Sequence, residues 1–207
     1  VILYATAENR AAASALARAG VRTIALRVDR IAQFFTLTER LGRALGAPEP
    51  AAALVDSVQR TLDRVRAVTA TTTPRTVVWP LWQQPVMVVG QGSYLDELIG
   101  IAGGRNVFHE LTAPSPVVSV EEIARRNPEF LITSATSATR LAAAPAWRAV
   151  PAVRERRFLQ DDPSLTGRPS VVLGSAAVAL ARLMHPELAR QLPPLPAART
   201  DSTRTRP

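Results

Sequence analysis

The residue types that most often carry chemistry are scarce in this chain. Cysteine is absent, which excludes disulfides, thiolate zinc sites, iron–sulfur clusters and a cysteine nucleophile. His109 and His185 are the only histidines, and neither has a histidine or cysteine partner at metal-ligand spacing. The sequence also lacks a G-x-S-x-G elbow, a Walker loop and an H-E-x-x-H motif. These absences argue against a catalytic centre, and both histidines are expected to be structural or surface residues.

Two adjacent carboxylates, Asp161 and Asp162, follow a predicted strand and precede a proline. Such a pair could ligate a hard cation or act as acid and base. Because nothing else in the sequence supplies the remaining ligands, a role as loop and turn residues is favoured.

A glycine-rich turn, Gly90-Gln91-Gly92-Ser93, is similar to the start of the dinucleotide fingerprint G-x-G-x-x-G. The third glycine is missing, and no acidic residue closes a following strand at the usual distance. The favoured interpretation is a tight turn and an N-cap at Ser93, with Asp96 supporting the helix N-terminus.

Two of the three tryptophans, Trp79 and Trp82, flank a proline in a predicted loop between two strands. Their rings could fill the core beneath this loop, or they could line a ligand cleft, where aromatic faces bind large apolar ligands. Trp82 is the better candidate for a cleft because it lies in the loop and not in the strand.

Ser119, Glu121 and Glu122 begin a predicted helix as part of a capping box. Ser119 is the expected N-cap, and Glu122 can reach back to the Ser119 amide. Glu121 has no such task and is expected to point to solvent. Its negative charge could simply stabilise the helix by interacting with the helix dipole, or its carboxylate could dock on an arginine of a partner protein.

The elements that must position these residues alternate between strands and helices. Residues 1–48 read as a strand over Val1–Ala5, a helix over Glu8–Ala19, a strand over Val21–Val28 and a helix from Asp29 to Leu45. This order predicts a parallel sheet covered by helices. Two strands are too few for a stable sheet, so the rest of this lobe is expected upstream of residue 1. The lack of a signal peptide therefore says nothing about export.

Residues 49–72 contain the longest predicted helix, over 49–70, with apolar residues at spacings of three and four. It is long enough to connect two lobes. Residues 73–190 form a second α/β unit, and the Pro-, Thr- and Arg-rich tail 191–207 is predicted to be disordered. The second unit's predicted strands are Thr76–Trp79, Val86–Val89, Val107–Phe108, Phe130–Ser134 and Arg157–Leu159, and its helices are Ser93–Ala102, Ser119–Asn127, one near Thr139–Ala144, and Ser170–Leu183.

Composition supports a globular protein, since 47% of the residues are hydrophobic. The formal net charge is +8 and every basic residue is arginine. These arginines are scattered and do not form a stripe, which argues against nucleic-acid binding. No run approaches the ~20 apolar residues of a membrane span.

The two motifs G-x-G-S-Y-L-D-E-L-I-x-x-A-G-G-x-N-V-F and V-S-V-E-E-I-A-x-x-N-P-E-F-L-I together resemble the C-terminal lobe of substrate-binding proteins for ABC importers. The class concerned carries vitamin B12, haem and iron–siderophore complexes. The resemblance implies an α/β fold of two Rossmann-like lobes joined by a single long helix, here with an incomplete N-terminal lobe. It also implies a monomer outside the cytoplasm, either free in the periplasm or anchored to the membrane.

A cleft between the lobes, formed by loops at the carboxyl ends of strands, is the ligand site that the resemblance implies. In this chain those loops lie at Thr6–Asn9, Trp79–Gln84 and Asp161–Arg168. The candidate ligand-binding residues are Trp82, Trp79, Gln83, Glu8, Asn9, Asp162 and Arg168. The family docks one exposed glutamate per lobe on arginine pockets of the membrane permease, and Glu121 matches the glutamate of the C-terminal lobe.

Among ligands, the tryptophans of the loop favour a corrinoid such as cobalamin, which would be cargo and not a cofactor. A haem protein should show an axial histidine or tyrosine in a cleft loop, whereas Tyr4 and Tyr94 lie in a strand and at a helix start. A ferric siderophore is an anionic chelate that cleft arginines would bind, and Arg154 and Arg168 leave this ligand open. An α/β enzyme acting on a nucleotide-like substrate, and a module that contacts proteins through its basic surface, are the alternatives of other classes.

Overall fold

The computed structural model describes the backbone of residues 2–4, 7–21 and 23–195, and the side chains of 10–21, 23 and 26–195. Most of the tail 191–207, predicted to be disordered, lies outside the described residues. The N-terminal part contains β1 (Ile2–Tyr4), α1 (Ala7–Arg18), β2 (Ile24–Leu26) and α2 (Ile31–Ala44), which α3 (Pro48–Thr69) follows.

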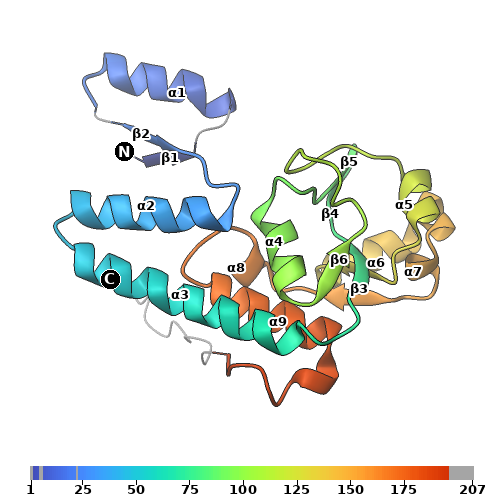
Figure 1. The fold of residues 1–207 in the computed structure, drawn as a ribbon. Helices are drawn as coiled ribbons and strands as arrows, with labels where there is room; N and C mark the ends of the chain where they lie inside the picture. The colour runs from blue at the N-terminus through green and yellow to red at the C-terminus, as the bar shows by residue number, and fades with distance from the viewer. Residues whose placement is uncertain (1, 5–6, 22, 196–207) are drawn as a thin grey trace, which may run out of the picture.

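In the N-terminal part, β1 and β2 pair in parallel and lie between α1 and α2 (Figure 1). Gly20 follows α1 with a φ of +74°, as expected for a glycine that ends a helix. Glu8 and Asn9, predicted to lie in a cleft loop, instead belong to the first turn of α1, and their side chains are outside the described set. The strand–helix alternation predicted from the sequence is therefore observed.

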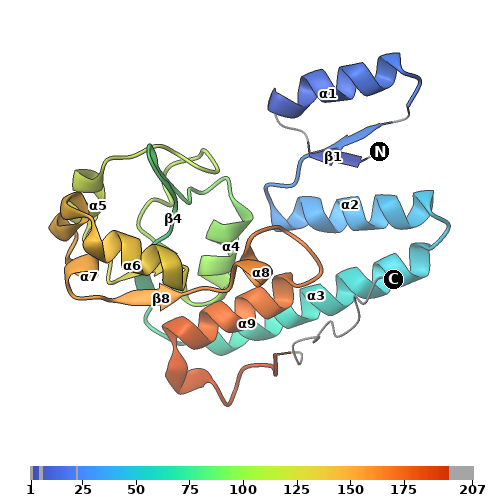
Figure 2. The ribbon, with the colours of Figure 1, turned by 180° about the vertical axis from the view of Figure 1, so that it is seen from behind.

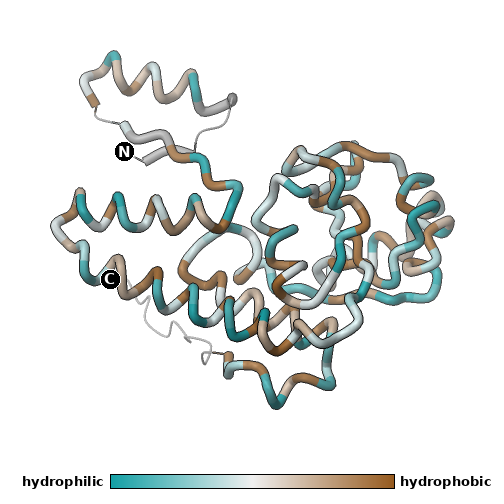
Figure 3. Tube along the Cα trace, viewed as in Figure 1, coloured by the Kyte–Doolittle hydropathy of each residue, from teal (hydrophilic) through white to brown (hydrophobic). Residues whose placement is uncertain are grey.

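The long helix predicted over 49–70 is α3, which spans 22 residues and about 33 Å. It begins with Pro48 at its first turn, where a proline costs no hydrogen bond. Hydrophobic and hydrophilic residues alternate along it (Figure 3). Its buried face, which includes Leu62 and Val65, packs against α2 on one side and α9 on the other. The helix is therefore part of the core and not a free connector.

The C-terminal lobe is built on a parallel sheet with the strand order β6-β3-β7-β8. Its strands are β3 (Arg75–Val78), β6 (Gly104–Asn106), β7 (Phe130–Thr133) and β8 (Phe158–Gln160), and a separate antiparallel hairpin consists of β4 (Pro80–Gln83) and β5 (Val86–Val88). The helices are α4 (Tyr94–Ile101), α5 (Val120–Arg126), α6 (Ala135–Ala143), α7 (Pro151–Arg154), α8 (Pro163–Thr166) and α9 (Leu173–Met184), with 3₁₀ turns at Pro145–Ala149 and Pro186–Leu188.

Helices cover both faces of this sheet. One core joins the sheet to α4, α9, α3 and the start of α2, and it includes Leu98, Leu180 and Phe34. A second core on the other face joins the sheet to α5, α6 and α7 and contains Phe108 and Trp147. Figure 2, seen from behind, shows α9 and α3 side by side, to the right of β8. The first core runs without a break from the N-terminal part into the C-terminal lobe.

The carboxylate of Glu97 on α4 ties the N-terminal part to the C-terminal lobe. Its Oε2 accepts the backbone N–H of Ile31, the first residue of α2, at 2.7 Å. Its Oε1 accepts Nε of Arg30 at 2.7 Å, and Arg30 also donates to the carbonyl of Gln91 at 3.2 Å. We call this set of contacts the Glu97 clamp.

Some predicted elements differ from those observed. The segment Trp79–Pro85, predicted to be a loop, holds strand β4, which pairs with β5 and turns at a cis Gln84–Pro85 bond. The strand predicted at Val107–Phe108 is observed directly before these residues, as β6 over Gly104–Asn106. Helices α7 and α8 were not predicted, because a helix of four residues is too short to show a hydrophobic period.

Candidate functional site

A pocket of about 370 Å³ opens at the carboxyl ends of β3, β7 and β8, where the N-terminal part faces the C-terminal lobe. From β3 the chain first crosses to β6 on one side and then to β7 on the other, so that β3 and β7 flank a topological switch point. Open α/β sheets bind ligands in the crevice at such a point. Val28 and Asp29, just before α2, line the opposite wall. We call this pocket the cleft.

A second hollow of about 450 Å³ continues from the cleft toward the hairpin. The two share Pro80, Leu81, Thr133 and Ser137 as lining residues. The second hollow is lined in addition by Trp82, Gln83, Gln84, Arg140 and Leu141. The structure therefore brings the predicted residues Trp79, Trp82 and Gln83 to one continuous surface.

The two tryptophans of this surface differ in exposure. Trp79 is only 5% exposed and belongs to the hydrophobic core, although it also lines the cleft. Trp82 on β4 is 62% exposed, and its Nε1 donates to the carbonyl of Gln84 at 3.0 Å. This hydrogen bond holds the indole along the hairpin, where its face is open to a ligand.

Two helices begin at the cleft with serine caps. Ser93 Oγ accepts the N–H of Leu95 at the start of α4, at 3.2 Å. Ser134 Oγ accepts the N–H of Ser137 at the start of α6, at 3.3 Å. A helix N-terminus carries a partial positive charge, so both ends favour ligand atoms that accept hydrogen bonds. Sequence reasoning missed Ser134, although a polar residue at the end of an apolar strand was the available signal.

Asp161 supplies a carboxylate to the cleft wall. Its Oδ2 accepts the Oγ1 hydrogen of Thr166 at 2.8 Å, and its backbone N–H donates to the carbonyl of Thr133. Burial raises the pKa of Asp161 above its ordinary value, because removal from water disfavours the charged form. Tyr94 donates its phenolic hydrogen to the carbonyl of Thr166 at 2.5 Å and is buried. Its hydroxyl is therefore already used in holding α8 against α4.

Asp162 and Arg168 do not line the cleft. The carboxylate of Asp162 is the N-cap of α8, where Oδ1 accepts the N–H of Ser164 at 2.8 Å. Hydrogen bonds from the Ser164 hydroxyl and from its backbone N–H lower the pKa of Asp162. Arg168 is exposed one residue beyond Gly167, which is the last residue of this loop to reach the lining.

Glu121 lies exposed in the first turn of α5. It forms no ion pair within the part of the chain that the structure describes. Hydrogen bonds from its own backbone N–H and from the Ser119 hydroxyl lower the pKa of Glu121, so it stays ionised in mildly acidic solution. Within the described residues, the surface offers a carboxylate without a counter-charge at this point.

The capping box of α5 is only half formed. Ser119 Oγ accepts the N–H of Glu122 at 3.1 Å, as predicted. The Glu122 carboxylate does not return to the Ser119 amide but accepts hydrogen bonds from Arg125 and Arg126. These guanidinium groups, three and four residues further on, are stronger partners than a neutral amide. Arg126 also stacks at 4.3 Å on the ring of Phe108, which holds α5 against the lobe.

The glycines of the predicted tight turn allow two segments to approach closely. A Cβ at Gly90 would lie 2.2 Å from the carbonyl oxygen of Ala113, and one at Gly92 would lie 2.5 Å from that of Thr112. These glycines therefore pack a loop and do not cradle a phosphate. Asp96 lies in the first turn of α4, as predicted, and its buried carboxylate also accepts hydrogen bonds from Asn106 and His109.

His185 is buried and bonded to the Gly103 carbonyl and Glu187, in keeping with the structural role predicted for it. No group of three or more histidine and acidic side chains that could hold a metal occurs among the described residues.

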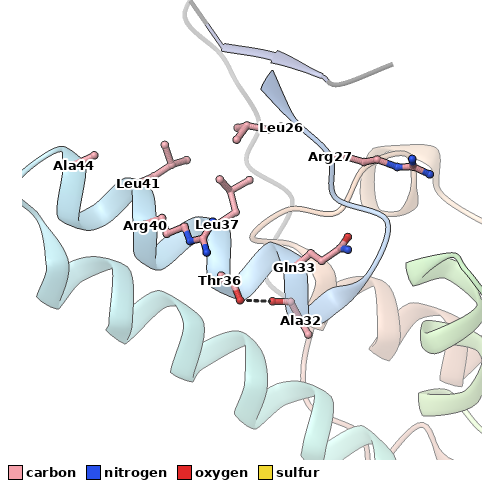
Figure 4. A pocket seen from close by; sticks show the side chains of 9 residues that line it. All are labelled: Leu26, Arg27, Ala32, Gln33, Thr36, Leu37, Arg40, Leu41 and Ala44. Carbon is pink, nitrogen blue, oxygen red and sulfur yellow. Dashed lines mark hydrogen bonds between the residues drawn. The ribbon is translucent and has the colours of Figure 1, made fainter. Parts of the chain in front are cut away.

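Another hollow, of about 670 Å³, lies between β2 and α2 (Figure 4). Leu37 and Leu41 of α2 face Leu26 of β2 across it, with Arg40 between the two leucines and Arg27 to one side. Apolar side chains that face each other between a sheet and a helix are typical of a core. This hollow also lies away from the carboxyl ends of the C-terminal strands, so the cleft is the better candidate site.

The family model described as periplasmic binding protein matches residues 1–165. The Vitamin B12-binding proteins of Vibrio cholerae and Photorhabdus laumondii are 26% and 29% identical to this chain over 96 residues. Each match covers 46% of this chain and 35% of the relative. The chain thus spans about a third of the length of the curated relatives that it matches.

Solved structures share the fold. An ABC transporter substrate-binding protein from Listeria monocytogenes EGD-e has a TM-score of 0.78 at 19% identity, over 89% of this chain and 76% of that one. The haem-binding protein BhuT reaches 0.73 at 23% identity, over 91% and 76%. The vitamin B12 binding protein BtuF of Vibrio cholerae reaches 0.67 at 20% identity, over 87% and 70%.

These likenesses confirm the predicted fold class, a mixed α/β architecture of the helical-backbone type. Among the described helices, none has the length and apolar character needed to cross a membrane. The match of the family model extends over most of the chain, including the sheet and the cleft. The chain therefore belongs to the periplasmic binding protein family.

Proposed function

We propose that this protein captures a corrinoid in the cleft outside the cytoplasm and delivers it to an ABC importer. The observation that carries the proposal is the continuous surface from the cleft to Trp82, which presents an open indole face beside a pocket at the switch point. A broad macrocycle can stack on such a face while its edge enters the pocket. The Vitamin B12-binding relatives support the same ligand class.

Haem is a less suitable cargo for this cleft. Haem proteins commonly hold the iron through a histidine or tyrosine. The cleft lining contains no histidine among the described residues, and its tyrosine, Tyr94, already donates its hydroxyl hydrogen to Thr166. A haem or ferric-siderophore protein of the same class nevertheless stays the alternative, since BhuT shares the fold.

An enzyme acting on a nucleotide-like substrate is the alternative of another class. It would need a phosphate loop or a convergent acid–base pair. The Gly90 turn is filled by the loop at Ala113, and the side-chain donor to Asp161 is the hydroxyl of Thr166, which is not an acid or a base at neutral pH. We therefore propose binding and delivery without chemistry, by a protein that acts as a monomer.

Titration of the natural full-length protein with cyanocobalamin, followed by tryptophan fluorescence, tests this function. Saturable quenching is expected, and Trp82→Ala should weaken the affinity about tenfold or more, in line with losses of 1–3 kcal/mol for a stacked aromatic group. Leu45→Ala is the control, because it also truncates an exposed apolar side chain but lies at the end of α2. Tight binding of haemin or a ferric siderophore, with no response to cyanocobalamin, would assign the alternative ligand.

A further inference from the structure

Four polar residues gather at one corner of the cleft. Thr133 ends strand β7, and Ser134 is the N-cap of α6. Ser137 lies in the first turn of α6, and Asp161 follows β8. The backbone N–H of Asp161 donates to the carbonyl of Thr133 at 3.2 Å, which holds the two strand ends together. All four line the same pocket, and we call them the polar corner.

The polar corner contains a carboxylate without a protein cation. Within the described residues, Asp161 forms no ion pair, and the Thr166 hydroxyl is its side-chain donor. The other carboxylate of the cleft, Asp29, is paired with Arg27. Because a carboxylate offers about four acceptor positions, Asp161 can still accept hydrogen bonds from a ligand. Desolvation raises its pKa, as expected for a group that lacks a counter-charge.

Beside this acceptor lie hydroxyl donors. Thr133 is only 4% exposed, and its hydroxyl has no hydrogen-bond partner in the described part of the chain. Ser134 accepts from the N–H of Ser137, and Ser137 accepts from Arg140, so each retains its own O–H for donation. The positive end of α6 lies at the same point. The corner therefore offers donors and an anionic acceptor side by side.

We propose that the polar corner recognises a carboxamide of the ligand, whose N–H is donated to Asp161 and whose carbonyl accepts from Thr133 or Ser134. A carboxamide has a donor and an acceptor on one carbon, which matches this arrangement. A carboxylate in the same place would bring a second negative charge to Asp161 and would leave Asp161 without a donor. The inference rests on the proposed function and names the group by which the same cleft selects its cargo.

Other charges around the cleft are compatible with this selection. Arg140 lies in the neighbouring hollow, where it is bonded to Ser137, and Arg168 is exposed outside the lining. An anionic group could reach them only in the outer part of the surface. Corrinoids carry carboxamides around their ring, whereas haem carries two carboxylates, so the polar corner would favour the first class.

Monocarboxylic acids of cyanocobalamin, in each of which one amide has been hydrolysed, test the inference on the natural full-length protein. At least one of these acids should bind about tenfold more weakly than cyanocobalamin, since a site built around a hydrogen-bonding group rejects analogues that lack it. In Asp161→Asn the difference should shrink to less than about threefold, because the like-charge repulsion is gone. Asp56→Asn on the exposed face of α3 removes the same charge without touching the cleft and should keep the full difference.

The outcomes separate this inference from the proposed function. If the unmodified protein binds cyanocobalamin and all of its monocarboxylic acids with equal affinity, the inference is overturned while the proposed function stands. Retention of the difference in folded Asp161→Asn would do the same. If cyanocobalamin does not bind, haemin is compared with its bisamide. Tighter or equal binding of haemin overturns both, whereas tighter binding of the bisamide supports the inference and removes only the corrinoid. Binding of none of these probes would overturn both.

Discussion

At the scale of single residues, this protein uses small side chains where two segments meet and large ones where a ligand can lie. Gly90 has a negative φ and is needed for space, because the carbonyl oxygen of Ala113 occupies the place of a side chain. Trp82, in contrast, is a large side chain that remains mostly exposed on the hairpin. Trp82 lines the hollow next to the cleft, and the Gly90 N–H donates to the carbonyl of Pro114, a residue of the cleft lining.

Gly90→Ala is expected to destabilise the protein by about 1–3 kcal/mol, since an added methyl group would overlap a backbone oxygen that cannot easily move. Gly100→Ala is the matched control. A Cβ at Gly100 on α4 meets nothing within 4 Å, so this change should stabilise the helix by about 0.5–1 kcal/mol. Urea unfolding of both variants measures the difference. An equal response of the two would contradict the packing role assigned to Gly90.

At the scale of elements, the Glu97 clamp acts on the first turn of α2. Helix N-termini leave backbone N–H groups without intrahelical partners, and Glu97 satisfies that of Ile31 from a different lobe. Gln33 adds a local cap, since its side chain accepts from the N–H groups of Asp29 and Arg30. The start of α2 is thus determined by residues that are distant in the sequence.

Glu97→Ala should destabilise the protein by about 1–3 kcal/mol, because it leaves the Ile31 N–H and the Arg30 guanidinium without their partner. Hydrogen exchange of the Ile31 amide should become faster. Glu39→Ala, which removes an exposed glutamate of α2, is the control and should stay within about 0.5 kcal/mol. Unchanged exchange at Ile31 would show that the clamp does not hold α2.

Local patterns in the sequence predicted many of these elements. The spacing of Leu62 and Val65 indicated α3, and Ser119 indicated the start of α5, since both signals lie within a few residues. Strand β4 was missed because Pro80 and Pro85 enclose it and prolines are typical of a loop, whereas pairing with β5 decides its structure.

The cleft was only partly predictable for the same physical reason. Trp79 and Trp82 stood out by type. Thr133 and Ser134 are common residues that gain importance only when β7 ends beside β3 and β8. Asp161 was placed in a cleft loop but was not among the predicted binding residues. Contacts between distant strands decide such a site, and a local pattern does not contain them.

At the scale of the whole molecule, the cleft and Glu121 belong to different faces of the C-terminal lobe. The cleft lies at the strand ends near α4 and α8, whereas Glu121 begins α5, which lies on the other side of the sheet from α4 (Figure 1). We propose that Glu121 docks on an arginine of the importer, as the family resemblance implies. Because the pKa of Glu121 is lowered, its carboxylate stays charged for this role even at a pH at which an ordinary glutamate begins to be protonated.

Glu121→Arg is therefore expected to weaken binding to the reconstituted permease at least tenfold, because repulsion between two arginines replaces the attraction of a charge pair. The affinity for the ligand should stay within twofold. Glu49→Arg is the control, because Glu49 is also an exposed glutamate in the first turn of a helix, α3. Pull-down with the permease and ligand titration measure the two effects. A loss of ligand affinity with normal docking would show that Glu121 has a different role.

The unbroken core that joins α2, α3 and α9 has a consequence for the residence time of the cargo. Opening the two parts widely would expose the buried faces of Leu62 and Val65, and each fully buried side chain of this kind contributes about 1.5–3 kcal/mol. Spontaneous leakage through such a motion should therefore be slow. We expect the bound molecule to leave on its own past the exposed hairpin, and rapid unloading to require force applied by the transporter.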